Sequence, residues 1–341
     1  MFHIKKSFQA FITLAVCIII ATIFKPRSNQ IYEEDTTDMS IKSFVPKSIL
    51  KNFLAIEQSE GVGARVRRSI GSMNAHNFSP FLLLDHFKSE TGGFPDHPHR
   101  GQETITYLLS GQIDHEDFTG SKGTLNPGDL QFMTAGRGIV HAEMPRHDGG
   151  AIPIGMQLWV DLPKELKACE PRYRDLLAKE IPVANPSDKV EVKVISGKSY
   201  GIDSVKDLAY TPVWYLDFNV KPGGSIEQEI PDGFNTFLYV LEGGLEVNDT
   251  KVPQYHCVLF KTDGTGVRAS VPADATGNTR FILVAGQILN QPIVQHGPFV
   301  ETSKEKIYQA FVDYQSNTNG FERAANWESE IGKRKIRMPG H

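Results

Sequence analysis

Short β-strand patterns begin near Val45 and continue through most of the chain. Each is a short run of β-branched, aromatic and other apolar residues, bounded by glycine, proline, asparagine or aspartate. Many short strands separated by such turn residues are typical of β-sandwiches and β-barrels. The sequence therefore predicts an all-β fold, with strands that include residues 104–109, 129–133 and 155–160.

A second series of strand patterns follows the first and suggests a duplicated barrel. The turn at residues 241–245 (LEGGL) resembles the turn at residues 109–113 (LSGQI), and each follows a strand with an aromatic residue. A chain of 341 residues is also long enough for two domains. We predict one barrel over residues 46–170 and a second over residues 171–341, which includes a short helix near residues 303–314 and a tail.

The first 45 residues differ from the rest of the chain. A mostly apolar run from residue 8 to residue 24 has lysine or arginine on both sides, and a polar, acidic linker follows it. We predict that residues 8–24 are an uncleaved membrane anchor. An organelle transit peptide is the alternative, because the first 32 residues contain no acidic side chain.

The composition narrows the classes of function. The formal net charge is −4, so no strong overall field attracts nucleic acid or acidic lipid, and we expect no direct sequence-specific binding of nucleic acid. Three widely separated cysteines, Cys17, Cys169 and Cys257, make a disulfide framework improbable. The sequence has no Walker loop, nucleotide-binding glycine fingerprint or nucleophile elbow, so nucleotide-dependent and hydrolase functions lack support.

Two pairs of candidate metal ligands stand out. His97 and His99 are two residues apart, so they share one face of an extended strand. His141 and Glu143 repeat this spacing about forty residues later. Two such pairs on neighbouring strands can converge on one ion. Three imidazoles and a carboxylate without a thiolate suit iron, manganese, nickel, copper or catalytic zinc rather than a structural zinc site.

The spacing does not decide which carboxylate binds the ion. Glu103 lies on the predicted face of His97 and His99, so it competes with Glu143 for the ion. His115 lies in the polar stretch DHED, which predicts a solvated turn residue rather than a ligand. His256 and His296 are forty residues apart, so we expect no metal in the second barrel.

A cluster of arginines precedes these ligands. Arg65, Arg67 and Arg68 occupy three of four consecutive positions in a predicted strand. They are a candidate patch for an acidic partner or for DNA phosphate. The alternative is an exposed strand whose arginines pair with nearby carboxylates.

At these residues the sequence resembles the pirin family of the cupin superfamily. The resemblance extends from about residue 50 to residue 330 and is strongest at residues 63–70, 93–103, 115–118, 126–130, 134–145 and 295–300. It implies two cupin jelly-roll β-barrels that face each other, with metal in the N-terminal barrel. By position it assigns the metal ligands as His97, His99, His141 and Glu143, and it places Glu103 in the second shell.

The resemblance also implies two kinds of function. Members of the family are iron-dependent quercetin 2,3-dioxygenases, or nuclear cofactors that bind transcription regulators, and plant members have signalling partners. The first implies Fe²⁺, or another divalent metal, with a flavonol-like substrate and Glu143 as the base that takes its hydroxyl proton. The second implies a metal-dependent partner surface. A monomer in the nucleus and cytoplasm is expected, although the apolar N-terminal segment points instead to membrane anchoring or organelle import.

Overall fold

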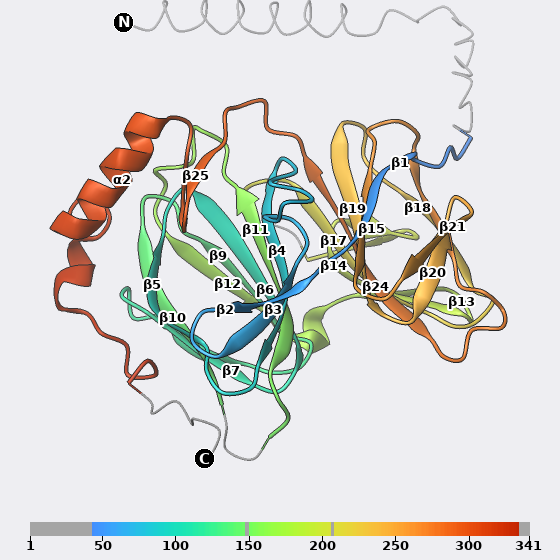
Figure 1. Cartoon of the computed structure of the whole chain (residues 1–341), viewed down its shortest axis with the longest axis horizontal. Helices are drawn as coiled ribbons and strands as arrows, with labels where there is room; N and C mark the ends of the chain where they lie inside the picture. Colours follow the sequence, from blue (N-terminus) through green and yellow to red (C-terminus); the bar gives the residue numbers. More distant parts are fainter. Residues whose placement is uncertain (1–42, 147–149, 206–207, 334–341) are drawn as a thin grey trace, which may run out of the picture. The chain divides into compact units, whose positions relative to one another are not determined.

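The computed structural model describes residues 43–146, 150–205 and 208–333. Its first barrel consists of a seven-stranded and a four-stranded antiparallel sheet (Figure 1). The larger sheet has the strand order β12-β9-β6-β11-β4-β3-β2, and the smaller has the order β5-β10-β7-β8. The strands are β2 (Glu57–Glu60), β3 (Ala64–Arg68), β4 (Phe81–Ser89), β5 (Phe94–His99), β6 (Gln102–Ser110), β7 (Ile113–Asp117), β8 (Lys122–Leu125), β9 (Leu130–Thr134), β10 (Ile139–Pro145), β11 (Ile154–Asp161) and β12 (Arg172–Leu176).

The second barrel repeats this design. Its larger sheet has the order β1-β22-β19-β24-β17-β14-β13, and its smaller sheet has the order β18-β23-β20-β21. The strands are β1 (Ile49–Leu54), β13 (Val183–Ser187), β14 (Val190–Ser196), β17 (Val213–Val220), β18 (Ser225–Glu229), β19 (Phe234–Glu242), β20 (Gly244–Val247), β21 (Thr250–Pro253), β22 (His256–Phe260), β23 (Gly266–Ser270) and β24 (Thr279–Gln287).

Smaller elements complete the described chain. Two short hairpins pair β15 (Lys198–Ser199) with β16 (Ile202–Asp203), and β25 (Val294–His296) with β26 (Phe299–Glu301). The helix α2 (Lys304–Ser316) begins after Ser303, whose side chain accepts a hydrogen bond from the Lys306 amide at 3.3 Å. Two 3₁₀ turns are η1 (Ala178–Glu180) and η2 (Glu322–Asn326). None of the helices in the described ranges has the length and apolarity to cross a membrane. The predicted anchor at residues 8–24 lies outside these ranges.

Alternate residues of the central strands face two different cores. In β19, Phe237 and Tyr239 belong to a cluster that contains residues of both barrels. Leu238 and Val240, between and after them, pack inside the second barrel. This alternation follows from the period of two in an extended strand. One face of the sheet therefore packs in the cluster shared by both barrels, and the other face packs inside the second barrel.

The two larger sheets therefore pack against each other. Phe81 of β4 contacts Phe237 of β19 edge to face, with ring centroids 5.0 Å apart. At the same interface the Tyr107 hydroxyl donates to Asp217 Oδ2 at 2.7 Å, and Arg280 Nη2 donates to the same oxygen at 2.8 Å. The predicted all-β fold of two barrels that face each other is confirmed.

Segments from each end of the chain join the barrel of the other half. Strand β1 pairs with β22 of the second barrel, whereas β12, beyond the predicted boundary at residue 170, pairs with β9 of the first (Figure 1). The helix α2 packs on the first barrel through Ile307 and Ala310, which join a cluster with Phe118 and Met133. The boundaries predicted at 46–170 and 171–341 need correction at these segments, because hydrogen-bonding partners far along the chain decide where each one lies.

Candidate metal centre and ligand pocket

Two neighbouring strands of the first barrel bring three histidines together. His97 and His99 come from β5, and His141 comes from β10, where it pairs directly with His97. The ring centroids of the three imidazoles are 4.4 to 5.1 Å apart. One nitrogen from each ring lies within 4.8 Å of the others, so the three side chains form a candidate metal centre.

The hydrogen bonds of His97 leave one nitrogen available for an ion. Its Nδ1 donates to the Pro95 carbonyl oxygen at 2.8 Å, so the neutral ring has a lone pair on Nε2. That Nε2 lies 3.0 Å from Nε2 of His141. Two nitrogens bound to one ion at about 2.1 Å and at right angles are also about 3.0 Å apart. The spacing of these two rings fits a shared metal ion.

The side chain of Gln102 contacts His99, the third histidine of the group. Its amide Nε2 lies 2.7 Å from Nδ1 of His99, whose Nε2 is buried without a hydrogen-bond partner in the described chain. A ring that binds metal through Nε2 carries its proton on Nδ1. The Gln102 amide oxygen, also buried without a partner there, can accept this proton when the amide turns over. Gln102 was not among the predicted site residues, although its position three residues after His99 was a signal.

Burial favours the neutral form of the three imidazoles. Desolvation lowers the pKa of His97, and it lowers the pKa of His99 and His141 well below the usual value of 6.5. Repulsion among the imidazolium forms of the three rings lowers the last two pKa values further. A neutral imidazole is the form that binds a metal, so the donor set suits an ion near neutral pH.

Glu143 lies on the wall of the same cavity but apart from the histidine group. Burial raises the pKa of its carboxyl from 4.5 to about 7, and a hydrogen bond from the Thr106 hydroxyl at 3.1 Å opposes this shift. The same hydroxyl oxygen lies 2.6 Å from Gln157 Oε1, so its single proton can go to either acceptor. Such a carboxyl exchanges protons near pH 7, so it can act as a base beside the histidines. Its ligation of metal stays a prediction.

Glu103 occupies a different place from the one predicted. It is buried, and its carboxylate accepts hydrogen bonds from the Thr134 hydroxyl at 2.7 Å and from the backbone amides of Tyr210 and Thr211 at 3.0 to 3.1 Å. It therefore holds the loop before β17 of the second barrel and has no described contact with the histidines. The predicted competing-ligand and second-shell roles are corrected. A turn at Gly101, with φ of +76°, ends β5, so the shared face does not continue into β6.

The prediction that His115 is a solvated turn residue is also wrong. It is only 3% exposed, and it lies within β7 rather than in a solvated turn. Its backbone pairs with Glu143 in β10, and its ring stacks on Tyr173 with centroids 6.2 Å apart. The acidic neighbours resemble a turn in sequence, but strands on both sides enclose this segment.

The three arginines all have carboxylate partners. Arg65 and Arg67 both pair with Glu57, at 2.9 and 3.0 Å. Arg68 pairs with Glu60 and Asp85, both at 2.7 Å, and it lines the cavity. This pairing matches the alternative of a strand neutralised by nearby acids. A role in partner binding stays a prediction.

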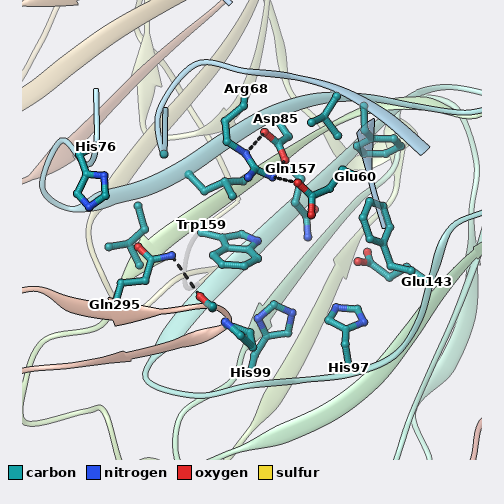
Figure 2. A pocket seen from close by; sticks show the side chains of 18 of the residues that line it. Glu60, Arg68, His76, Asp85, His97, His99, Glu143, Gln157, Trp159 and Gln295 are labelled. Carbon is teal, nitrogen blue, oxygen red and sulfur yellow. Dashed lines mark hydrogen bonds and ion pairs between the residues drawn. The ribbon is translucent and has the colours of Figure 1, made fainter. Parts of the chain in front are cut away.

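A cavity of about 530 Å³ extends from the histidines (Figure 2). Most of its wall is apolar, and Trp159 packs edge to face against His99 with centroids 5.1 Å apart. Its volume suits one drug-sized aromatic molecule. The apolar lining comprises Val66, Leu82, Leu83, Phe87, Phe94, Ile113, Trp159 and Pro298.

Two jelly-roll barrels, with clustered imidazoles beside a cavity in the first, define a two-domain cupin with a candidate metal centre. The Pirin family matches residues 63–160, and the Pirin C-terminal cupin domain matches residues 215–320. The chain is 48% identical over 293 residues to human pirin, which covers 84% of this chain and 98% of the relative. It is 47% identical over 289 residues to a pirin-like protein of Solanum lycopersicum, with 84% and 97% covered. The chain belongs to the pirin family.

Solved structures agree with this assignment. A quercetin 2,3-dioxygenase from Acinetobacter baumannii superposes with a TM-score of 0.73 at 29% identity and covers 80% of this chain and 98% of its own. A Geobacillus kaustophilus protein gives a TM-score of 0.65 at 33% identity and covers 73% and 99%. The predicted family is therefore confirmed.

Proposed function

We propose that the chain is a metal-dependent dioxygenase of the quercetin 2,3-dioxygenase type, which opens the ring of a flavonol with dioxygen and releases carbon monoxide. The observation that carries the proposal is the group of three imidazoles, one half-buried and two buried, beside an apolar cavity. The similarity to the Acinetobacter quercetin 2,3-dioxygenase supports it.

Fe²⁺ is the proposed ion, and other divalent metals can compete for the same nitrogens. His97, His99 and His141 would hold it, and the predicted fourth ligand is Glu143. When bound, the ion would supply Lewis acidity toward the hydroxyl and keto oxygens of the flavonol and reactivity toward dioxygen.

Glu143 would take the proton of the flavonol hydroxyl. A carboxylate is basic enough for this role when its pKa lies near the working pH, and burial gives Glu143 a pKa of about 7 in the metal-free protein. The Thr106 hydroxyl orients one carboxylate oxygen. The proton leaves the substrate oxygen as negative charge spreads into the conjugated ring.

The apolar wall would orient the substrate and exclude bulk water. Trp159 and Phe94 line the cavity together with the histidines, so flat aromatic rings can pack between them. Exclusion of water strengthens the electrostatic contacts made at the histidine end.

The test measures metal content and carbon monoxide release from quercetin under air. We expect about one iron per chain together with turnover, and loss of both in the His97→Ala, His141→Ala double variant. His256→Ala, a half-buried histidine of the second barrel, is the control and is expected to retain both. Bound iron without carbon monoxide release would reject the dioxygenase and favour a metal-dependent partner-binding protein.

A further inference from the structure

A charged group forms the cavity wall away from the histidines. Glu60, Arg68 and Asp85 come from the consecutive strands β2, β3 and β4, and all three line the cavity. Figure 2 shows this group on one side of Trp159, with His97 and His99 on the other. A ligand that reaches the histidines can therefore also meet charged groups at its other end.

The hydrogen bonds within this group leave two atoms without partners. Arg68 donates from Nε and Nη2 to the two oxygens of Asp85, at 2.9 and 2.7 Å, and from Nη2 to Glu60 Oε2 at 2.7 Å. Among the described residues, no hydrogen bond uses Arg68 Nη1 or Glu60 Oε1. The group thus offers one free donor and one free acceptor.

The charge of the group restricts what it can bind. One guanidinium faces two carboxylates, so the local formal charge is negative and disfavours a carboxylate or phosphate on the ligand. A hydroxyl both donates and accepts a hydrogen bond, so it matches the free pair of atoms. The apolar, aromatic cavity wall indicates that this hydroxyl is attached to an aromatic ring.

Structural stabilisation alone explains only part of the arrangement. Asp85 already gives Arg68 a bidentate partner and, with its side chain only 7% exposed, satisfies the charge inside the wall. Glu60 adds a second carboxylate whose side chain is 36% exposed, and it leaves an excess negative charge at the cavity. A ligand hydroxyl that donates to this carboxylate gives the excess charge a function.

We propose that Glu60 and Arg68 are specificity-determining residues that bind a phenolic hydroxyl at the end of the ligand distant from the histidines. The hydroxyl donates to Glu60 Oε1 and accepts from Arg68 Nη1. This inference rests on the proposed function, because it takes the occupant of the cavity to be a flavonol. It narrows the substrate class to polyphenols with a neutral distal hydroxyl.

The test compares the binding of two flavonols without turnover. Quercetin carries distal hydroxyls, whereas 3-hydroxyflavone keeps only the hydroxyl and keto oxygens expected at the histidine end. Quenching of tryptophan fluorescence under argon reports binding, since Trp159 lines the cavity. We expect the full chain to bind quercetin at least about tenfold more tightly, as one hydrogen bond to a charged group provides.

Three variants separate recognition from folding. Glu60→Ala removes the acceptor, and Arg68→Lys removes Nη1 but keeps a cation beside buried Asp85. Both are expected to weaken the binding of quercetin and to leave the affinity for 3-hydroxyflavone unchanged. The ratio of the quercetin affinity to the 3-hydroxyflavone affinity should therefore fall toward one. The matched control Glu57→Ala removes a carboxylate of the same strand that pairs with Arg65 and Arg67 outside the cavity, and it is expected to keep the ratio.

The outcomes distinguish this inference from the dioxygenase proposal. An unchanged ratio in Glu60→Ala and Arg68→Lys would overturn the inference alone, whether or not quercetin is turned over. A lowered ratio in a protein that releases no carbon monoxide would support the hydroxyl site and overturn only the dioxygenase. Failure of the wild-type chain to bind either flavonol would overturn the inference, whatever the protein binds instead.

Discussion

Arg100 Nη1 donates to Asp313 Oδ2 at 2.7 Å, and both side chains are almost fully buried. The bond connects α2 to the residue that follows His99, a candidate metal ligand. Arg100 also donates to the carbonyl oxygens of Arg137 and Asn319 at 2.6 and 2.5 Å. One guanidinium therefore joins the end of β5, the loop before β10 and the turn after α2.

Loss of this ion pair is expected to destabilise the protein strongly. Asp313→Ala leaves a buried guanidinium without its carboxylate, which costs about 3 to 5 kcal/mol. Glu227→Ala breaks an exposed pair with Arg268 and is expected to cost less than about 1 kcal/mol. Denaturant unfolding of both variants measures the difference, and equal costs would contradict the prediction.

A second contact from the C-terminal region holds the residue before His97. The Ser329 hydroxyl donates to the Asp96 carboxylate, and the Ser329 amide donates to the same carboxylate at 3.1 Å. We expect Ser329→Ala to lose bound metal several-fold faster during dialysis, with a stability cost of about 1 kcal/mol. Ser303→Ala removes the α2 N-cap at a comparable cost of about 1 kcal/mol and serves as control. Similar metal loss from both variants would argue against a specific role of Ser329.

Glu143 should make the stability of the metal-free protein depend on pH. Its pKa rises from 4.5 to about 7 on folding, so the folded state binds more protons than the unfolded state between these values. The contribution of Glu143 to stability therefore falls as pH rises through this window, by about 3 kcal/mol at pH 8 relative to pH 4. Unfolding of the wild type and of Glu143→Gln at several pH values isolates this effect. As pH rises, the free energy of unfolding of the variant should increase relative to that of the wild type. A difference between the two that does not depend on pH would reject the prediction.

Glu103 should affect stability rather than metal binding. Glu103→Ala leaves the Tyr210 and Thr211 amides without their acceptor, at a cost of about 2 to 3 kcal/mol. Glu103→Gln keeps an acceptor oxygen and should lose less. Iron content measured in the folded protein should stay near the wild-type value in both variants. A loss of iron in Glu103→Gln with little change in stability would restore the second-shell role.

Local sequence patterns predicted which elements form better than they predicted which distant segments those elements contact. His97 and His99 could be paired from spacing alone, because alternate residues of a strand share a face. Glu103 follows the same spacing but lies beyond the turn at Gly101, where Cβ of any other residue would lie 1.9 Å from the Val300 carbonyl oxygen. That close approach depends on a segment two hundred residues away, so no local pattern contains it.

The attachment of α2 shows the same limit. Its helical spacing is visible in the sequence, as is the serine that caps it. Its position on the first barrel depends on distant contacts such as Arg100 with Asp313. Likewise, the sequence showed the three arginines, but only the packing of β2, β3 and β4 places Arg68 in the cavity wall.

The contacts of Asp313 and Ser329 impose an order on biosynthesis. A ribosome makes the three histidines long before Asp313 and Ser329, which contact Arg100 just after β5 and Asp96 within it. Until then Arg100 and Asp96 lack these partners. Both supports of the strand that carries His97 and His99 are therefore in place only after residue 329 has been made.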